Sequence, residues 1–313
     1  MAKNVKISVI SMSPPHTSYE EFLEIKLQEM QAFLQTELNK VLPDKPDLIV
    51  LPEMCDFFRA FTAEQNKVYY KVRGNRILDF LSQVARENHC YIAYCAVRYL
   101  PEEKELPFRN STQIIGRDGK VVGIYDKNHL VPLELENREV AYGTEAPVFQ
   151  LDFGKVACAI CFDLNYQELL NKYAAQQPDL IIFSSHYHGG IAQSNWAYQC
   201  RAFFAGSVTE DESRILNPFG EPVAATVSGD DALTHTVNMD YAICHLDNNE
   251  EKIQAAKEKY GENLSVYDPG HIGCVMLSYE GTDKTVKDIL EEFQIATADA
   301  YFDACRAHRN AHI

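Results

Sequence analysis

Apolar residues along this chain follow two patterns, short continuous runs and longer stretches with helical spacing. The runs at 48–51 and 156–160 predict strands that are buried on both faces, because such strands carry apolar residues at successive positions. Between Phe22 and Val41 the apolar residues recur at near-helical spacing, which predicts an amphipathic helix over residues 18–42. Runs and helical stretches alternate along the chain, and this alternation is typical of a layered α/β fold.

Two pairs of apolar runs predict antiparallel hairpins. The first pair, 111–116 and 121–125, flanks an Asp118-Gly119 turn, and the second pair, 214–217 and 222–227, flanks another glycine-containing turn. Because hairpins are mixed with strand–helix units, we expect a layered α/β sandwich and not a purely parallel sheet.

A polar residue stands at the end of three of these strands. Glu53 follows the run at 48–51, Lys127 follows the strand at 121–125, and Cys161 directly follows the run at 156–160. Ligand sites in layered α/β folds form beyond the carboxyl ends of such strands, so we expect the three side chains to meet. A carboxylate, an ammonium and a thiol supply a base, a cation for an oxyanion and a nucleophile.

The residues around these three positions resemble motifs of the nitrilase, or carbon–nitrogen hydrolase, superfamily. Members carry a Glu after Leu-Pro, a Lys in a Tyr-x-Lys-x-His-Leu context, and a Cys between Ile and an aromatic residue followed by Asp or Glu. The matching segments are Leu51-Pro52-Glu53, Tyr125-Asp126-Lys127-Asn128-His129-Leu130 and Ile160-Cys161-Phe162-Asp163. Their order and spacing agree with the family, as does the stretch at 142–149.

The resemblance implies the family's four-layer α-β-β-α sandwich and a catalytic triad. Glu53 would be the base and Cys161 the nucleophile, while Lys127 and the backbone N–H of Phe162 would bind the oxyanion. We also expect Lys127 and the start of the following helix to favour the thiolate of Cys161. The two-step thioester scheme needs no metal or organic cofactor.

Many members of this family carry a second Glu shortly after the Lys, where it orients the ammonium. Glu134 and Glu136 both lie in the corresponding stretch of this chain. We favour Glu134 for this role and keep Glu136 as the alternative.

A His-x-His pair, His186 and His188, follows a strand end on the same side as the triad. Two ligands without a third seldom form a metal site, so we expect these residues to line the substrate pocket and predict no metal. Phe162 and Asp163, next to the thiol, are expected to contact the substrate as well.

Charge and composition narrow the class of protein. The net charge of −16 argues against nucleic acid and against an anionic membrane surface as partners, because both require clustered cations. The chain starts without a signal-peptide pattern and has nine cysteines, which together predict a cytoplasmic protein with reduced thiols. Asn110-Ser111-Thr112 matches a glycosylation sequon, which we attribute to chance.

We expect a carbon–nitrogen hydrolase domain over residues 1–280 and a C-terminal extension over residues 281–313. The extension has a helical pattern, and in relatives such segments commonly reach across a two-fold interface. This predicts a homodimer or a larger even-numbered homo-oligomer. The extension is too apolar to remain a tail exposed to water, since it contains Ile289, Leu290, Phe293, Ile295, Tyr301 and Phe302.

The sequence therefore predicts a thiol-dependent hydrolase that cleaves a non-peptide C–N bond of a small molecule. An amide or N-carbamoyl group is favoured, with release of ammonia or an amine. A nitrile-hydrolysing enzyme, which would use the same residues through a thioimidate, is one alternative. A non-catalytic family member that binds a small ligand is the other.

Overall fold

The computed structural model describes residues 3–19, 22–227 and 229–313, which form two compact units. The larger unit extends from residue 6 to residue 235, and the smaller one contains the residues from 236 onward together with residues 3–5. This boundary lies before the expected one at 280/281, because three further strands form a sheet of their own with the C-terminal helices. The assignment of the hydrolase domain to residues 1–280 stays a prediction.

The first sheet of the larger unit has six strands, with parallel pairing in its middle and antiparallel pairing at one end. Strands β1, β2 and β3 pair in parallel, whereas β3–β4 and β4–β5 pair antiparallel, so the predicted hairpin at 111–125 is confirmed. In spatial order the strands are β12 (Ala232–Asn238), β1 (Asn4–Ile10), β2 (Leu48–Val50), β3 (Tyr91–Tyr99), β4 (Phe108–Ile115) and β5 (Val121–Asp126).

The second sheet repeats this plan. Strands β7, β8 and β9 pair in parallel, and β6, β10 and β11 add antiparallel pairs at the two sides, so the second predicted hairpin is confirmed as well. In spatial order the strands are β11 (Pro222–Ala225), β10 (Arg214–Leu216), β9 (Phe203–Val208), β8 (Leu180–Ser185), β7 (Gly154–Ile160) and β6 (Val148–Leu151).

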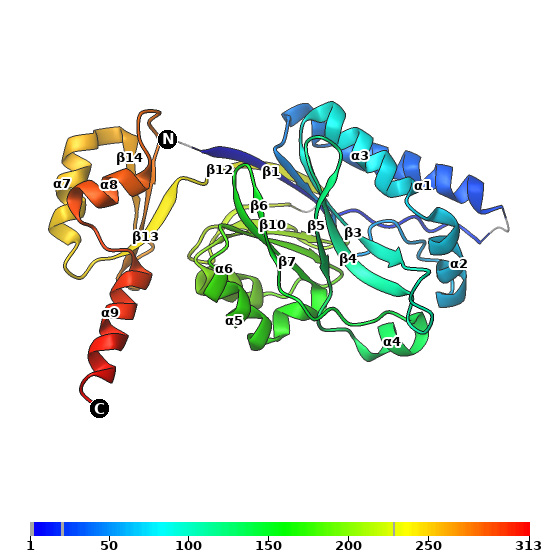
Figure 1. Ribbon diagram of the computed structural model, residues 1–313. Helices are drawn as coiled ribbons and strands as arrows, with labels where there is room; N and C mark the ends of the chain where they lie inside the picture. The colour runs from blue at the N-terminus through cyan, green and yellow to red at the C-terminus, as the bar shows by residue number, and fades with distance from the viewer. Residues whose placement is uncertain (1–2, 20–21, 228) are drawn as a thin grey trace. The chain divides into compact units, whose positions relative to one another are not determined.

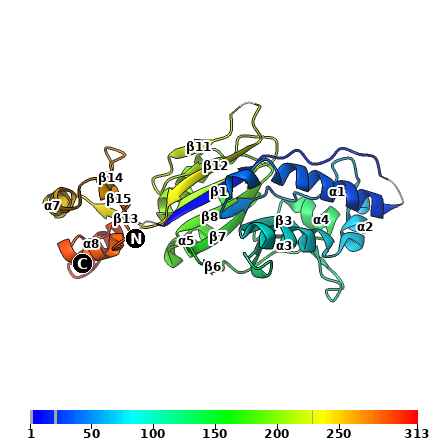
Figure 2. The same ribbon diagram turned by 90° about the horizontal axis from the view of Figure 1, so that it is seen from above.

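Helices cover the outer faces of the two sheets, which confirms the expected four-layer α-β-β-α sandwich. Figures 1 and 2 show α1 and α3 on one side of the sheets and α5 and α6 on the other. Helix α1 begins at Leu23 and not at residue 18, and residues 20 and 21 of the expected helix lie outside the described residues. The helices are α1 (Leu23–Leu38), α2 (Ala63–Arg73), α3 (Arg76–Asn88), α4 (Pro132–Arg138), α5 (Gln167–Gln176) and α6 (Ile191–Cys200).

Two buried serine hydroxyls join the sheets at the ends of their central strands. Ser184 Oγ donates a hydrogen bond to the carbonyl oxygen of Leu51 at 2.8 Å, and Ser207 Oγ donates one to that of Ile10 at 2.7 Å. Both serines are fully buried, where a hydrogen bond is stronger than in water. These bonds fix the end of β2, which leads to Glu53, against the end of β8.

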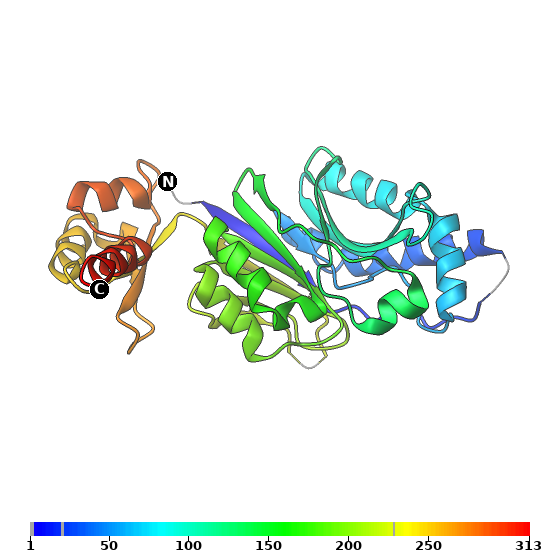
Figure 3. The ribbon, with the colours of Figure 1, turned by 60° about the horizontal axis from the view of Figure 1, so that its bottom comes forward.

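The smaller unit has its own core. Its antiparallel sheet has the order β13 (Tyr241–His245), β15 (Cys274–Tyr279) and β14 (Leu264–Tyr267). Helices α7 (Glu250–Tyr260), α8 (Val286–Phe293) and α9 (Ala298–Asn310) appear in gold, orange and red in Figure 3. Ile289, Leu290 and Ile295 are buried in this core, so these three do not need an oligomer interface to leave water. From Phe302 onward every residue is exposed.

Within residues 3–19, 22–227 and 229–313, no helix combines the length and the apolar content needed to cross a bilayer.

Candidate active site

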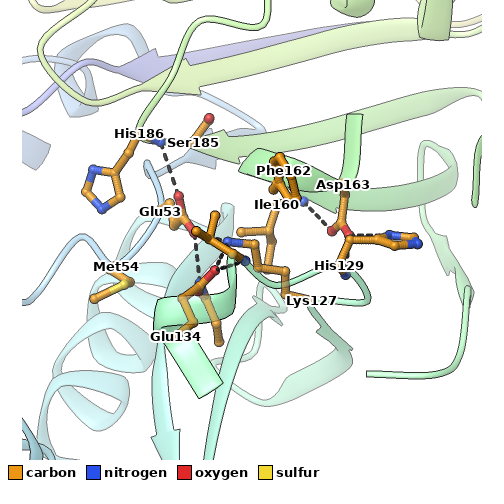
Figure 4. A network of polar contacts seen from close by, with 12 residues as sticks. Glu53, Met54, Lys127, His129, Glu134, Ile160, Phe162, Asp163, Ser185 and His186 are labelled. Atoms are coloured by element: carbon orange, nitrogen blue, oxygen red, sulfur yellow. Dashed lines mark hydrogen bonds and ion pairs between the residues drawn. The ribbon is translucent and has the colours of Figure 1, made fainter. Parts of the chain in front are cut away.

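Lys127 lies between two carboxylates that come from separate segments of the chain (Figure 4). Its Nζ donates hydrogen bonds to Oε1 of Glu53 at 2.8 Å and to Oε2 of Glu134 at 2.8 Å. Glu53 follows the end of β2, Lys127 directly follows β5, and Glu134 lies in α4. All three side chains are buried, so this charged network is held inside the protein.

Glu134 is positioned by the start of its own helix. Its Oε2 also accepts a hydrogen bond at 2.9 Å from the backbone N–H of Val131, which precedes α4. This capping contact fixes the carboxylate toward Lys127. Glu136, the alternative from the sequence, is exposed, and none of its contacts joins the network.

Asn110 completes the network, and the sequence analysis did not find it. The side chain lies on β4 and is 1% exposed, and its Nδ2 donates hydrogen bonds to Glu53 Oε1 at 2.8 Å and to Glu134 Oε1 at 3.0 Å. Burial excludes glycosylation of this asparagine in the folded chain. The signal in the sequence that points to Asn110 is the predicted hairpin. Across this hairpin the backbone N–H of Lys127 donates a hydrogen bond to the backbone carbonyl of Asn110 at 2.9 Å, so the asparagine lies beside the lysine.

The charges within the network set the protonation of Glu53 and Lys127. Burial, the largest single effect, would raise the pKa of Glu53, but the ammonium of Lys127 together with His186 and a hydrogen bond with Cys161 holds this pKa well below its ordinary value. Burial would lower the pKa of Lys127, whereas the carboxylates of Glu53 and Glu134 raise it above its ordinary value. Near neutral pH, Glu53 is therefore a carboxylate beside a permanent cation.

Cys161 stands where β7 ends, in a left-handed backbone conformation with φ of +49°. It opens a short 3-10 helix, Cys161–Asn165, and α5 begins only at Gln167. Burial, followed by the negative charge of Glu53, raises the pKa of its thiol to about 12 and outweighs the opposing effect of Lys127. Lys127 favours the thiolate, as expected, but its effect is too small to bring the thiol pKa below the ordinary value, so the thiol needs a base.

Asp163 is fully buried and contacts protein groups on both sides of the thiol. Its Oδ2 accepts from Tyr125 Oη at 2.7 Å and from the N–H of Ile160 at 3.0 Å, and its Oδ1 accepts from the N–H of His129 at 2.9 Å. These contacts tie the turn at the thiol to the loop after β5. Neither Asp163 nor the half-buried Phe162 lines the pocket described below, so their contact with substrate stays a prediction.

The two histidines of the His-x-His pair have different surroundings. His186 lines the pocket, and its backbone N–H donates to Oε2 of Glu53 at 3.2 Å. His188 does not line it, and its Nδ1 accepts from the N–H of Gly190 at 3.0 Å. Among the residues that the structure describes, no three His, Cys, Asp or Glu side chains are grouped so as to hold a metal ion.

A pocket of about 230 Å³ opens over the network and the thiol. This volume is below the roughly 300–1,000 Å³ of typical ligand sites, which favours a small substrate. Met54, whose backbone also has a positive φ of +49°, forms part of its wall. The lining residues are Glu53, Met54, Lys127, Val131, Leu133, Glu134, Arg138, Cys161 and His186.

Comparison with known proteins gives one family. The sequence model described as carbon-nitrogen hydrolase matches residues 12–229. The omega-amidase NIT2-A of Xenopus laevis is 24% identical over 222 residues, which cover 62% of this chain and 77% of that protein.

Solved structures share the fold at low sequence identity. Saccharomyces cerevisiae Nit3, a member of branch 10 of the nitrilase superfamily, matches with a TM-score of 0.62 and 17% identity, covering 83% of this chain and 95% of that one. A single-residue mutant of the amidase from Nesterenkonia sp. AN1 matches with a TM-score of 0.60 and 16% identity, covering 75% and 91%. In that structure the acetamide moiety of fluoroacetamide is covalently added at the active-site cysteine.

Proposed function

This chain belongs to the carbon–nitrogen hydrolase family, and from that premise we propose that it is an amidase that cleaves a small-molecule amide through a thioester on Cys161. The observation that carries the proposal is the position of the thiol beside the buried network of Glu53, Lys127 and Glu134 at a small pocket. The omega-amidase and amidase relatives support an amide over a nitrile.

In the first half of the reaction, Cys161 attacks the carbonyl carbon of the amide. Because its pKa is about 12, the thiol gives up its proton only as the C–S bond forms, and Glu53 accepts that proton. Lys127 and the backbone N–H of Phe162 stabilise the negative charge on the carbonyl oxygen. Glu53 then passes the proton to the leaving nitrogen, the C–N bond breaks, and ammonia leaves.

In the second half, water hydrolyses the thioester. Glu53 takes a proton from the water as its oxygen attacks the carbonyl carbon, and the same cation and N–H stabilise the second oxyanion. The C–S bond breaks, the proton returns to sulfur, and the carboxylic acid product leaves. Glu134 and Asn110 act through Lys127 and Glu53 by holding both groups in place, so we regard them as positioning residues.

Ammonia release tests this proposal. The purified chain is incubated with a panel of small amides, N-carbamoyl amino acids and nitriles, and the Cys161→Ala variant is the control. We expect release from amides by the parent chain and none by the variant. Preferred release from the carbamoyl compounds or the nitriles would replace the amide with those substrates.

Labelling with a haloacetamide separates the enzyme from the non-catalytic alternative. Cys305 is exposed, whereas seven of the other cysteines are buried, so the experiment starts from a Cys305→Ser background. We expect peptide mass spectrometry to find the label on Cys161. Absence of both labelling and ammonia release would favour the non-catalytic alternative.

We also propose that the chain forms a homodimer or a larger even-numbered homo-oligomer through α9. Ile289 and Leu290 are buried in the core of the smaller unit, so they are not available to an interface. The apolar surface that supports this proposal is therefore that of α9. Phe302 is 36% exposed there, and Tyr301 is half-buried.

A further inference from the structure

A second cavity, of about 330 Å³, lies on the first sheet between strands β3, β4 and β5 and the start of α3. This volume exceeds that of the catalytic pocket and falls within the roughly 300–1,000 Å³ of typical ligand sites. Tyr94, Gln113 and Ile124 are paired across the three strands, and all of them line the cavity. Asn110 and Gln113 are three positions apart on β4, so their side chains point to opposite faces of the sheet. The cavity therefore lies behind the catalytic network, across the sheet from it.

Gln113 has a buried amide that the fold leaves without a partner. The residue is 6% exposed and lines the cavity, and within residues 3–19, 22–227 and 229–313 its side chain forms no hydrogen bond. Buried side-chain amides in folded proteins nearly always bond to the protein or to ordered water. The amide of Gln113 is therefore available to a molecule in the cavity.

Two guanidinium groups line the cavity, whereas the carboxylates that pair with them do not. Arg73 pairs with Asp56 at 2.6 Å, and Arg98 pairs with Asp126 at 3.2 Å. Arg98 uses Nε and Nη2 in its hydrogen bonds, and its Nη1 has no partner among the described residues. Glu102, the one carboxylate among the described residues of the wall, is exposed. A polar group that is buried in the cavity therefore meets mainly hydrogen-bond donors.

Much of the remaining wall is apolar. Leu78 and Leu100 are half-buried, and Val121 and Ile124 are exposed on β5. These side chains would leave water if the apolar body of a ligand lay against them.

We propose that this cavity binds a small monocarboxylic acid, which acts as an inhibitor from outside the catalytic pocket. The carboxylate would bind Nη1 of Arg98 and the amide of Gln113, and the apolar body would lie against the aliphatic wall. Hydrogen bonds from a guanidinium to a carboxylate are stronger than those between neutral groups.

The inhibition follows from the position of Asp126. This residue directly precedes Lys127, and its carboxylate is held by Arg98. A ligand carboxylate that binds Arg98 competes with Asp126 for the guanidinium, which loosens the segment that positions Lys127. We expect kcat to fall while KM stays near its original value. This part of the inference rests on the proposed amidase function.

Calorimetry with phenylacetate tests the binding, and 2-phenylethanol is the comparison because it has a similar shape without the charge. Two matched variants identify the site. Ile124→Trp fills the second cavity and Leu133→Trp fills the catalytic pocket, and each replaces an exposed aliphatic residue that lines only one of the two. We expect binding of phenylacetate, weaker binding of the alcohol, loss of binding in Ile124→Trp and retention in Leu133→Trp.

Gln113→Leu measures the contribution of the amide. It should weaken phenylacetate binding about 10- to 100-fold, and because it removes an unpartnered buried amide, the melting temperature should not fall. Unchanged affinity in this variant overturns the proposal. Equal binding of the alcohol, no binding at millimolar phenylacetate, or loss of binding in Leu133→Trp alone also overturns it.

Initial rates on the preferred amide test the inhibition. Saturating phenylacetate should lower kcat of the parent chain, and Ile124→Trp should be insensitive to it. An unchanged kcat, or a rise in KM alone as for a competitor of the substrate, overturns the inhibitory role. If the parent chain hydrolyses no amide, the amidase function fails, and the calorimetry still decides whether the cavity binds the acid.

Discussion

Asn110 donates a hydrogen bond from Nδ2 to Oε1 of Glu53 at 2.8 Å, inside a site where both residues are almost fully buried. The same nitrogen donates to Oε1 of Glu134 at 3.0 Å. One neutral amide and one ammonium therefore bridge two carboxylates that would otherwise repel each other.

Asn110→Asp should reduce kcat by about 100-fold, because a third carboxylate replaces the donor that separates the first two. Asn110→Ala should lose less, about 10-fold, since it removes the bridge without adding charge. Initial-rate kinetics gives the two values, and circular dichroism checks that both variants fold. Equal activity of Asn110→Asp and the parent chain would contradict a positioning role.

Cys161→Ala should abolish ammonia release while the melting temperature stays near that of the parent. The thiol is the nucleophile, and its side chain is only partly buried. Cys158→Ala, in the strand that leads to Cys161, is the matched control. Its fully buried side chain packs in the core, so this variant should lose stability by about 1 kcal/mol and keep most of its activity. Turnover by Cys161→Ala would exclude the thioester mechanism.

Glu134→Gln should lower kcat by about 100-fold, whereas Glu136→Gln should leave it near the parent value. Both substitutions remove one carboxylate from α4, but only Glu134 accepts from Lys127. Without that charge Lys127 is held less firmly toward the oxyanion. The opposite ranking would transfer the role to Glu136.

The pH profile of kcat/KM should be flat through the neutral range. Glu53 must be ionised to act as base, and because its folded pKa lies below the ordinary 4.5, activity is full above about pH 4.5 and falls only in stronger acid. The same depressed pKa stabilises the fold above about pH 4.5, and this contribution is lost as the pH falls through the folded value. The thiol pKa of about 12 predicts no change near the value of about 8.5 for a free thiol.

Kinetics between pH 4 and pH 10 on the preferred amide, at roughly constant ionic strength, measures this profile. The Glu53→Gln variant is the comparison and should lose about 10²–10³ in rate. A rise in activity centred near the free-thiol value would show that a thiolate forms before substrate binds.

Removal of the residues from Tyr301 onward should convert the proposed oligomer to monomers without unfolding the smaller unit. The truncation keeps Ile289, Leu290 and Ile295, which belong to the core of that unit. A deletion from residue 284, by contrast, would remove core residues and confuse dissociation with unfolding. Light scattering at micromolar concentration reports the mass, and a full-length monomer would refute the proposal.

The pattern of apolar runs was sufficient to predict the layered fold and the two hairpins. It was sufficient because strands buried on both faces leave a strong local signal, as at 48–51 and 156–160. The four layers came from the family resemblance, since the pattern of one chain does not show how many layers pack together. The same strand ends led to Glu53, Lys127 and Cys161.

The sequence did not predict features that depend on distances between separate segments. Asn110 lies 57 positions from Glu53, and only the folded sheet, in which β3 lies between β2 and β4, brings the two together. The raised thiol pKa was not predicted, because the adjacent cation was considered without the burial and the Glu53 charge that outweigh it.

The hydrogen bond from Ser184 to Leu51 joins two halves of a divided active site. The base and the cation follow strands of one sheet, whereas the nucleophile follows a strand of the other. A folding intermediate in which either sheet has formed alone therefore contains no complete reaction centre. Catalytic competence arises in the last step, when the sheets dock, and the recovery of activity during refolding reports that step and not the formation of secondary structure.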